Sequence, residues 1–125
     1  MYRSATPNAY RESAVMTASP AQLVVMLYDG AGKFLRQAIA MFEHAEIAKA
    51  GIAIGRAQAI VEELFATLDI ERGGEIASRL QGIYVFCLSE MADARIEAKP
   101  DRLHEVTRLL GELRESWQQI SLQHG

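Results

Sequence analysis

Apolar residues recur every three or four positions along most of this chain, and this spacing constrains the fold more than any other feature. An α-helix has 3.6 residues per turn, so the spacing places the apolar side chains of each segment on one face. Four such segments follow one another, at about 20–46, 53–68, 74–98 and 103–120, with short connections between them. Short connections make consecutive helices antiparallel neighbours. The sequence therefore predicts an all-α fold, an antiparallel up-down four-helix bundle.

The apolar stripes predict which face each helix buries. They consist of Leu23, Leu27, Ala31, Phe34, Ala38, Phe42 and Ala45 in the first helix, Ala57, Ile60, Val61, Leu64 and Leu68 in the second, Ile76, Leu80, Ile83, Cys87, Met91 and Ala94 in the third, and Leu103, Val106, Leu110, Leu113, Trp117 and Ile120 in the fourth. Breaks between the helices are expected at 49–51, 69–74 and 99–101. In the second break, Gly73 and Gly74 are expected to allow a tight turn into the third helix.

The start of the first helix is marked by three residues. Ser19 is a favourable N-cap, Pro20 suits the first helical position, and Gln22 completes a capping box. The segment before it, residues 1–18, is polar with scattered apolar residues such as Tyr10, which is typical of a mobile N-terminal arm. We therefore expect an arm over 1–18 and one bundle domain over 19–125.

Composition excludes several classes of function. With 13 basic and 16 acidic residues and no run of Lys or Arg, the chain is not expected to bind nucleic acid. No apolar stretch is long enough to span a membrane and no secretion signal is present, so we expect a cytoplasmic protein without membrane insertion. The single Cys87 forms no internal disulfide and is expected to be a buried, unreactive thiol.

The fragment "DGAGK" at 29–33 resembles part of a phosphate-binding loop, but it lacks two required residues. Phe34 stands where the magnesium-binding hydroxyl belongs, and Leu27 stands where the first glycine belongs. The fragment also lies within a helical pattern. Gly30 and Gly32 are therefore interpreted as packing residues that allow close approach of a neighbouring backbone.

Catalytic and metal-binding patterns are weak. Four-helix bundles that bind two metals use paired Glu-x-x-His motifs, and only Asp101 and His104 approach that spacing here. His44 is the one candidate for phosphotransfer, although its acidic neighbours would repel a phosphoryl group. Glu62 and Glu63 are adjacent on a helix and point in different directions, so they form no acid–base pair. We expect no enzyme, no cofactor and no metal, with His44 phosphotransfer and an Asp101–His104 metal enzyme as the alternatives.

Several apolar residues lie off the stripes and widen the apolar surface. They are Val24, Tyr28, Leu35, Ile39, Phe65, Tyr84 and Phe86. They either complete the core or form grooves that receive an amphipathic helix from a partner.

Particular segments, in order, resemble the flagellar secretion chaperone (FliS) family. They are "AY" at 9–10, "TASPAQLVVMLYDGA" at 17–31, "RAQAIVEELFATLD" at 56–69, "GGEIASRLQGIY" at 73–84 and "LLGELRESW" at 109–117. The resemblance covers roughly 9–120, and the order "TASPxxLxxMLYDG" then "LDxxxGGEIAxxL" is specific.

The resemblance implies an antiparallel four-helix bundle that binds the C-terminal region of flagellin in the cytoplasm. Such a chaperone prevents premature polymerisation and delivers flagellin to the flagellar type III export gate without ATP. The N-terminal arm that carries the tyrosine, here Tyr10, is implied to be able to cover an apolar groove and to take part in docking of the loaded chaperone at the gate. Self-association is left open. The candidate partner-binding residues are Tyr10, Val24, Leu27, Tyr28, Phe65, Ile83 and Tyr84.

Overall fold

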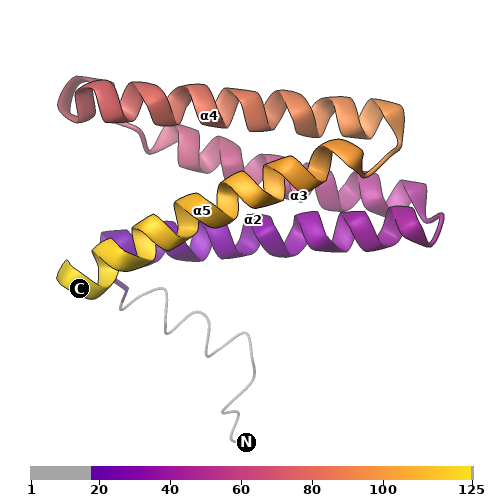
Figure 1. The fold of residues 1–125 in the computed structure, drawn as a ribbon, viewed down its shortest axis with the longest axis horizontal. Coiled ribbons are helices and arrows are strands. Elements are labelled where there is room, and N and C mark those ends of the chain that lie inside the picture. Colours follow the sequence, from indigo (N-terminus) through magenta and orange to yellow (C-terminus); the bar gives the residue numbers. More distant parts are fainter. Residues whose placement is uncertain (1–17, 125) are drawn as a thin grey trace, which may run out of the picture.

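Four long helices form an antiparallel bundle in the computed structural model, which describes residues 18–124 (Figure 1). They are α2 (Pro20–Glu43), α3 (Ile47–Ala66), α4 (Ile70–Glu97) and α5 (Asp101–His124). Each helix packs on the next, and α5 closes the ring by packing on α2. No strand occurs within the described range, so the predicted all-α bundle is confirmed. Tyr10 and most of the predicted arm lie outside that range.

The predicted start of α2 is confirmed. The Ser19 backbone N–H donates to Gln22 Oε1 at 2.7 Å, and the Gln22 backbone N–H donates to Ser19 Oγ at 3.2 Å. Pro20 occupies the first helical position. These two bonds form the capping box, and they satisfy backbone donors that a helix start would otherwise leave free.

The predicted break at 49–51 is wrong, because the α2–α3 turn lies at 44–46. The backbone reverses at Ala45, which adopts a φ of 59°, a conformation that glycine usually supplies. His44 helps to end α2, since its Nδ1 lies 2.8 Å from the carbonyl oxygen of Ala40. Gly51 instead lies within α3, where Arg95 of α4 passes over it.

The sequence predicted a break between the second and third helices at 69–74, but part of this segment is helical. Asp69 caps α4 by accepting a hydrogen bond from the Arg72 backbone N–H at 3.2 Å, and one helical turn follows. At Gly74 the backbone has φ 55° and ψ −129°, which interrupts the helix. Gly73 is packed tightly, since an added Cβ would lie 2.6 Å from the Cβ of Ala77. The backbone role expected for these glycines agrees with this geometry.

Glycines in α2 behave differently from one another. A Cβ added at Gly30 would lie 3.1 Å from Cδ1 of Ile60, so this glycine does allow close packing of α3. A Cβ at Gly32 would meet only the Arg36 side chain of the same helix. The expectation of close approach is therefore wrong for Gly32.

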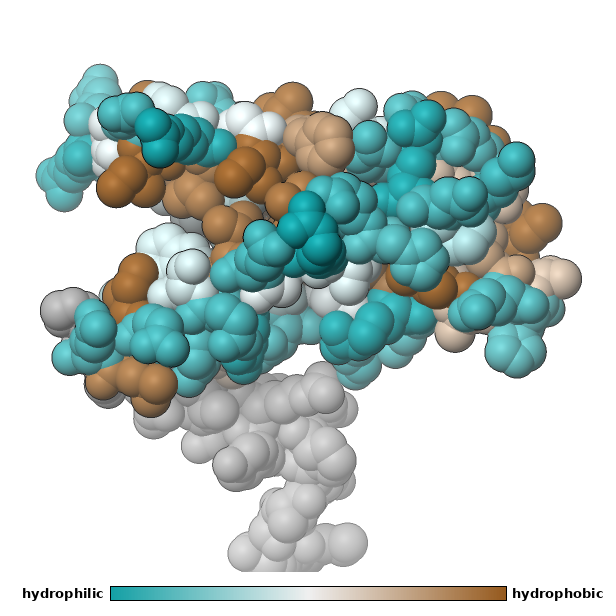
Figure 2. Space-filling model, in the orientation of Figure 1, coloured by the Kyte–Doolittle hydropathy of each residue, from teal (hydrophilic) through white to brown (hydrophobic). Residues whose placement is uncertain are grey.

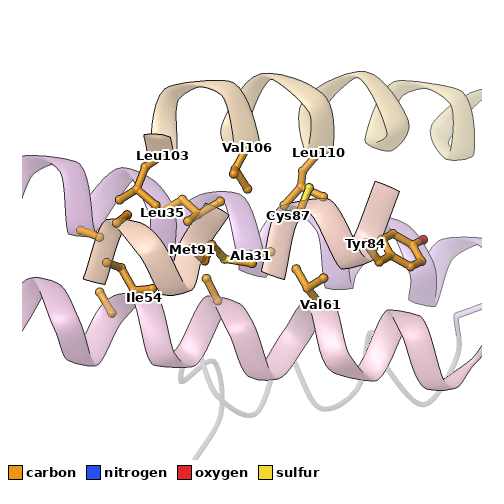
Figure 3. Close-up of a cluster of buried hydrophobic side chains, with 14 of the residues drawn as sticks. Ala31, Leu35, Ile54, Val61, Tyr84, Cys87, Met91, Leu103, Val106 and Leu110 are labelled. Atoms are coloured by element: carbon orange, nitrogen blue, oxygen red, sulfur yellow. The ribbon is translucent and has the colours of Figure 1, made fainter. Parts of the chain in front are cut away.

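The core is an aliphatic cluster to which every helix contributes (Figure 3). The buried side chains include Ala31 and Leu35 from α2, Ile54 and Val61 from α3, Cys87 and Met91 from α4, and Leu103, Val106 and Leu110 from α5. Cys87 is buried as predicted, and burial raises the pKa of its thiol to about 11.

Charged side chains link α4 to α5 at the closed end of the bundle, the end with the 44–46 and 98–100 turns. Arg102 Nη1 lies 2.9 Å from Glu90 Oε2, and Arg102 Nη2 lies 3.0 Å from Glu97 Oε2. Asp93 contributes a third carboxylate at 3.9 Å. One guanidinium thus joins the two helices where they meet, whereas at the opposite, open end α4 and α5 separate (Figure 1).

Candidate functional site

The open end of the bundle contains a groove with a volume of about 1140 Å³. In Figure 1, α5 runs obliquely from the end of α4 to the start of α2, and so leaves the beginning of α4 uncovered. Figure 2 shows this end hollowed between α4 above and α2 and α5 below, with hydrophobic side chains facing the hollow. The groove is lined by Pro20, Ala21, Leu23, Val24, Met26, Leu27, Asp29, Gly30, Lys33, Glu63, Leu64, Thr67, Leu68, Asp69, Gly73, Ile76, Ala77, Leu80, Tyr84 and Trp117.

The apolar residues of this groove include members of the predicted stripes that the bundle does not cover. Leu23 begins the stripe of α2 and is 37% exposed, and Ile76 begins the stripe of α4 and is 73% exposed. The prediction that they are buried is therefore wrong for the chain alone. The stripes continue past the point where the helices separate, so the groove is an extension of the core that lacks a covering element.

Two hydrogen-bonded tyrosines of the core lie next to the groove, and one of them, Tyr84, lines it. The hydroxyl oxygens of Tyr28 and Tyr84 are 2.5 Å apart, and each residue is only 2% exposed. Burial raises the pKa of both phenols, and the hydrogen bond to Tyr84 raises that of Tyr28 further. Both side chains are therefore neutral near pH 7. Their bond joins α2 to α4 where the groove begins.

The rim of the groove carries four ionisable side chains. Asp29 forms an ion pair with Arg114 of α5, with Oδ1 and Nε 2.8 Å apart. Asp69 caps the start of α4. Lys33 and Glu63 make no ion pair with any residue in 18–124. The groove thus combines an apolar floor with charges confined to its edges, a combination typical of sites that receive an amphipathic helix.

The candidate partner-binding residues occupy different positions relative to the groove. Val24, Leu27 and Tyr84 line it, whereas Tyr28 is buried in the core and is not among the lining residues. Phe65 and Ile83 are partly buried against the core and are not among its lining residues. Other lining residues, such as Leu80, Ala77 and Trp117, were not predicted to bind a partner. Their spacing matches that of core residues, and nothing in the sequence marks where the helices separate.

The structure shows where the residues of the alternative phosphate, phosphotransfer and metal sites lie. Residues 29–33 are an ordinary part of α2, not a loop after a strand. His44 is exposed at the α2–α3 turn and contacts the end of its own helix. Asp101 and His104 lie in the first turn of α5, and no group of three or more potential metal ligands occurs in the part of the chain that the structure describes.

Comparison with known proteins identifies the family. Residues 2–124 match the family described as "Flagellar protein FliS". This chain belongs to the FliS family. The flagellar secretion chaperone FliS of Salmonella typhimurium is 38% identical over 126 residues, which cover 97% of this chain and 93% of that protein. The resemblance inferred from the sequence is confirmed.

Two further FliS relatives support the same assignment. The flagellar secretion chaperone FliS of Campylobacter jejuni is 34% identical over 113 residues, covering 90% of this chain and 88% of that protein. The flagellar secretion chaperone FliSB of Pseudomonas aeruginosa is 36% identical over 110 residues, covering 88% of this chain and 87% of that protein. These alignments extend over nearly the full length of each protein. Among residues 18–124, no helix is long and apolar enough to cross a membrane.

Proposed function

We propose that this FliS-family protein is a cytoplasmic export chaperone that holds the C-terminal region of flagellin in the groove at its open end. The observation that carries this proposal is that the stripes of α2 and α4 continue, uncovered, into the groove, as Leu23 and Ile76 show. An amphipathic helix laid there would bury these residues as a further helix of the bundle. Its own apolar face would be withdrawn from other flagellin subunits, which prevents premature polymerisation.

The shape of the groove suits a guest that must be released. Its lining is spread over all four helices, and the apolar contacts come from many residues of moderate size such as Val24 and Leu80. Affinity distributed over many modest contacts is lost gradually as the guest peels away. No covalent step or nucleotide is needed for release in this scheme.

A titration of flagellin into the chaperone, followed by calorimetry, tests the proposal. We expect full-length flagellin to form a stoichiometric complex and flagellin without its C-terminal helices to bind at least a hundredfold more weakly, a difference of about 2.7 kcal/mol. Equal affinities would place the binding segment elsewhere in flagellin.

We also propose that Tyr10 acts in the next step, docking of the loaded chaperone at the flagellar type III export gate. Support comes from the sequence, where an aromatic residue occurs ten positions before the first long helix within a polar segment. An aromatic side chain in such a segment gains little from exposure to water and provides a compact anchor for a partner.

A further inference from the structure

The hydrogen bond between Tyr28 and Tyr84 uses only one of their two hydroxyl protons. Between the two oxygens of Tyr28 and Tyr84, 2.5 Å apart, only one proton can lie. The other hydroxyl proton must point elsewhere. Among residues 18–124, neither hydroxyl makes a hydrogen bond to a second acceptor oxygen. One O–H of the pair is therefore free to donate.

The position of the two rings indicates which hydroxyl faces a guest. Both tyrosines belong to the buried core cluster, but only Tyr84 is also among the residues that line the groove. In Figure 3 the Tyr84 hydroxyl points away from the labelled aliphatic side chains. When Tyr28 donates to Tyr84, the Tyr84 proton is directed outward from the pair, and the groove is the space beside it.

We propose, on the basis of the function above, that Tyr84 donates a hydrogen bond to a neutral side-chain oxygen of the guest, an amide or hydroxyl on its otherwise apolar face. In this arrangement Tyr28 donates to the Tyr84 oxygen, which leaves the Tyr84 proton for the guest. The guest is thus an amphipathic helix that carries one Asn, Gln, Ser or Thr among the apolar residues that enter the groove.

The chemistry of the groove favours a neutral side-chain acceptor over two alternatives. The backbone carbonyls of a helix are already bonded within it, apart from those of the last turn. A carboxylate would lose its hydration among the apolar residues that line the groove, which is costly for a charged group. An amide or hydroxyl oxygen avoids both of these problems.

The same hydroxyl gives selectivity. A guest that covers the groove shuts the Tyr84 hydroxyl off from solvent, so a wholly apolar guest would leave that proton without an acceptor. Sites built to form a hydrogen bond discriminate against analogues that lack the partner group for this reason. The groove would therefore select a helix with a polar residue at one position, and disfavour other apolar segments in the cell.

A double-mutant cycle tests the inference, with a C-terminal flagellin fragment as the probe. Each Asn, Gln, Ser and Thr of the fragment is replaced in turn by Ala, and every fragment is titrated into the wild type and into Tyr84→Phe. We expect one fragment position at which the replacement weakens binding to the wild type about fivefold, the usual effect of one hydrogen bond. The same replacement should leave binding to Tyr84→Phe unchanged.

Tyr28→Phe is the matched control, because it removes the same tyrosine–tyrosine bond but keeps the Tyr84 hydroxyl. Both variants should lose similar thermal stability, whereas only Tyr84→Phe should lose the coupling to the guest position. If no polar position of the fragment costs the wild type more than twofold, or if Tyr84→Phe shows the same pattern as the wild type, the inference is overturned while the chaperone function stands. Failure of the wild type to bind any fragment would overturn both.

Discussion

At the scale of single residues, the backbone at Gly74 decides how α4 begins. Its φ of 55° with ψ of −129° lies in a region that residues with a Cβ almost never adopt. The helical turn before it places the cap Asp69 at the rim of the groove, and the helix after it carries Ile76 and Ala77 along the groove wall. The geometry of the groove therefore depends on a residue with no side chain.

Gly74→Ala and Gly73→Ala should each destabilise the protein by about 1–3 kcal/mol, the first through backbone strain and the second through the contact with Ala77. Gly82→Ala is the matched control on the same helix, because a Cβ there would meet no atom within 4 Å. It should be neutral or slightly stabilising. Urea unfolding curves give the free energy of unfolding of all three variants. Equal behaviour of Gly74→Ala and Gly82→Ala would contradict the assigned backbone role.

Tyr10→Ala should leave thermal stability unchanged and flagellin affinity within about threefold, a change below about 0.7 kcal/mol. Binding of the loaded complex to the export gate should fall strongly, since the aromatic anchor is lost. Melting curves, flagellin titration and gate binding are measured on the same variant. A lower melting temperature with normal gate binding would assign Tyr10 a structural role, because burial of an aromatic ring contributes roughly 1.5–3 kcal/mol.

At the scale of helices, α4 and α5 are held together at one end and apart at the other. Arg102 joins them at the closed end through Glu90 and Glu97. The hydrogen bonds from Arg102 hold the pKa of Glu97 below its ordinary value. A carboxylate whose pKa is lower in the folded state binds fewer protons there than in the unfolded chain. Its contribution to stability is complete above the ordinary pKa and is lost as the pH falls through the lowered pKa.

Arg102→Gln should therefore lower the melting temperature at pH 7, and its difference from the wild type should shrink as the pH falls below about 4. Arg79→Gln is the control, because Arg79 pairs with Glu75 of the same helix, α4, and both side chains are about three-quarters exposed. Its effect should be small. A melting difference for Arg102→Gln that stays constant from pH 7 to pH 3 would contradict the role of the ion cluster.

The sequence predicted four helices, their order and most of the core, because burial on one helical face leaves a clear period. It did not predict which apolar residues the bundle leaves open. Helical spacing places Leu23 on the predicted stripe of the first helix and Leu35 off it, yet Leu35 is buried in the core and Leu23 lines the groove. The difference arises because α5 crosses toward α2 and leaves the start of α4 uncovered (Figure 1). The spacing of apolar residues along a helix does not indicate the direction of that helix relative to its neighbours.

The α2–α3 turn was misplaced for a similar reason. Gly51 was interpreted as a helix break, but it lies within α3, and Nε of Arg95 in α4 is 3.7 Å from the position of an added Cβ. The actual turn has Ala45 in a left-handed conformation, which cannot be predicted from an alanine in the sequence.

At the scale of the whole molecule, an ion cluster links α4 to α5 at one end of the bundle, and the groove lies at the other end. We propose that the C-terminal region of flagellin occupies this open end. Two isoleucines of α4 allow a direct comparison, because Ile76 is 73% exposed and lines the groove, whereas Ile96 is 82% exposed near the closed end. Replacing either by Glu places a charge on an exposed position, so neither change should disturb folding.

The decisive measurement is the affinity of the flagellin C-terminal region for wild type, Ile76→Glu and Ile96→Glu, determined by calorimetry alongside melting curves. A guest in the groove would have to bury the new carboxylate at position 76, which is costly without a partner charge. We predict that Ile76→Glu weakens binding at least tenfold, about 1.4 kcal/mol, and that Ile96→Glu stays within twofold of the wild type. Equal affinities of the two variants, with both proteins folded, would contradict the assignment of the groove as the flagellin site.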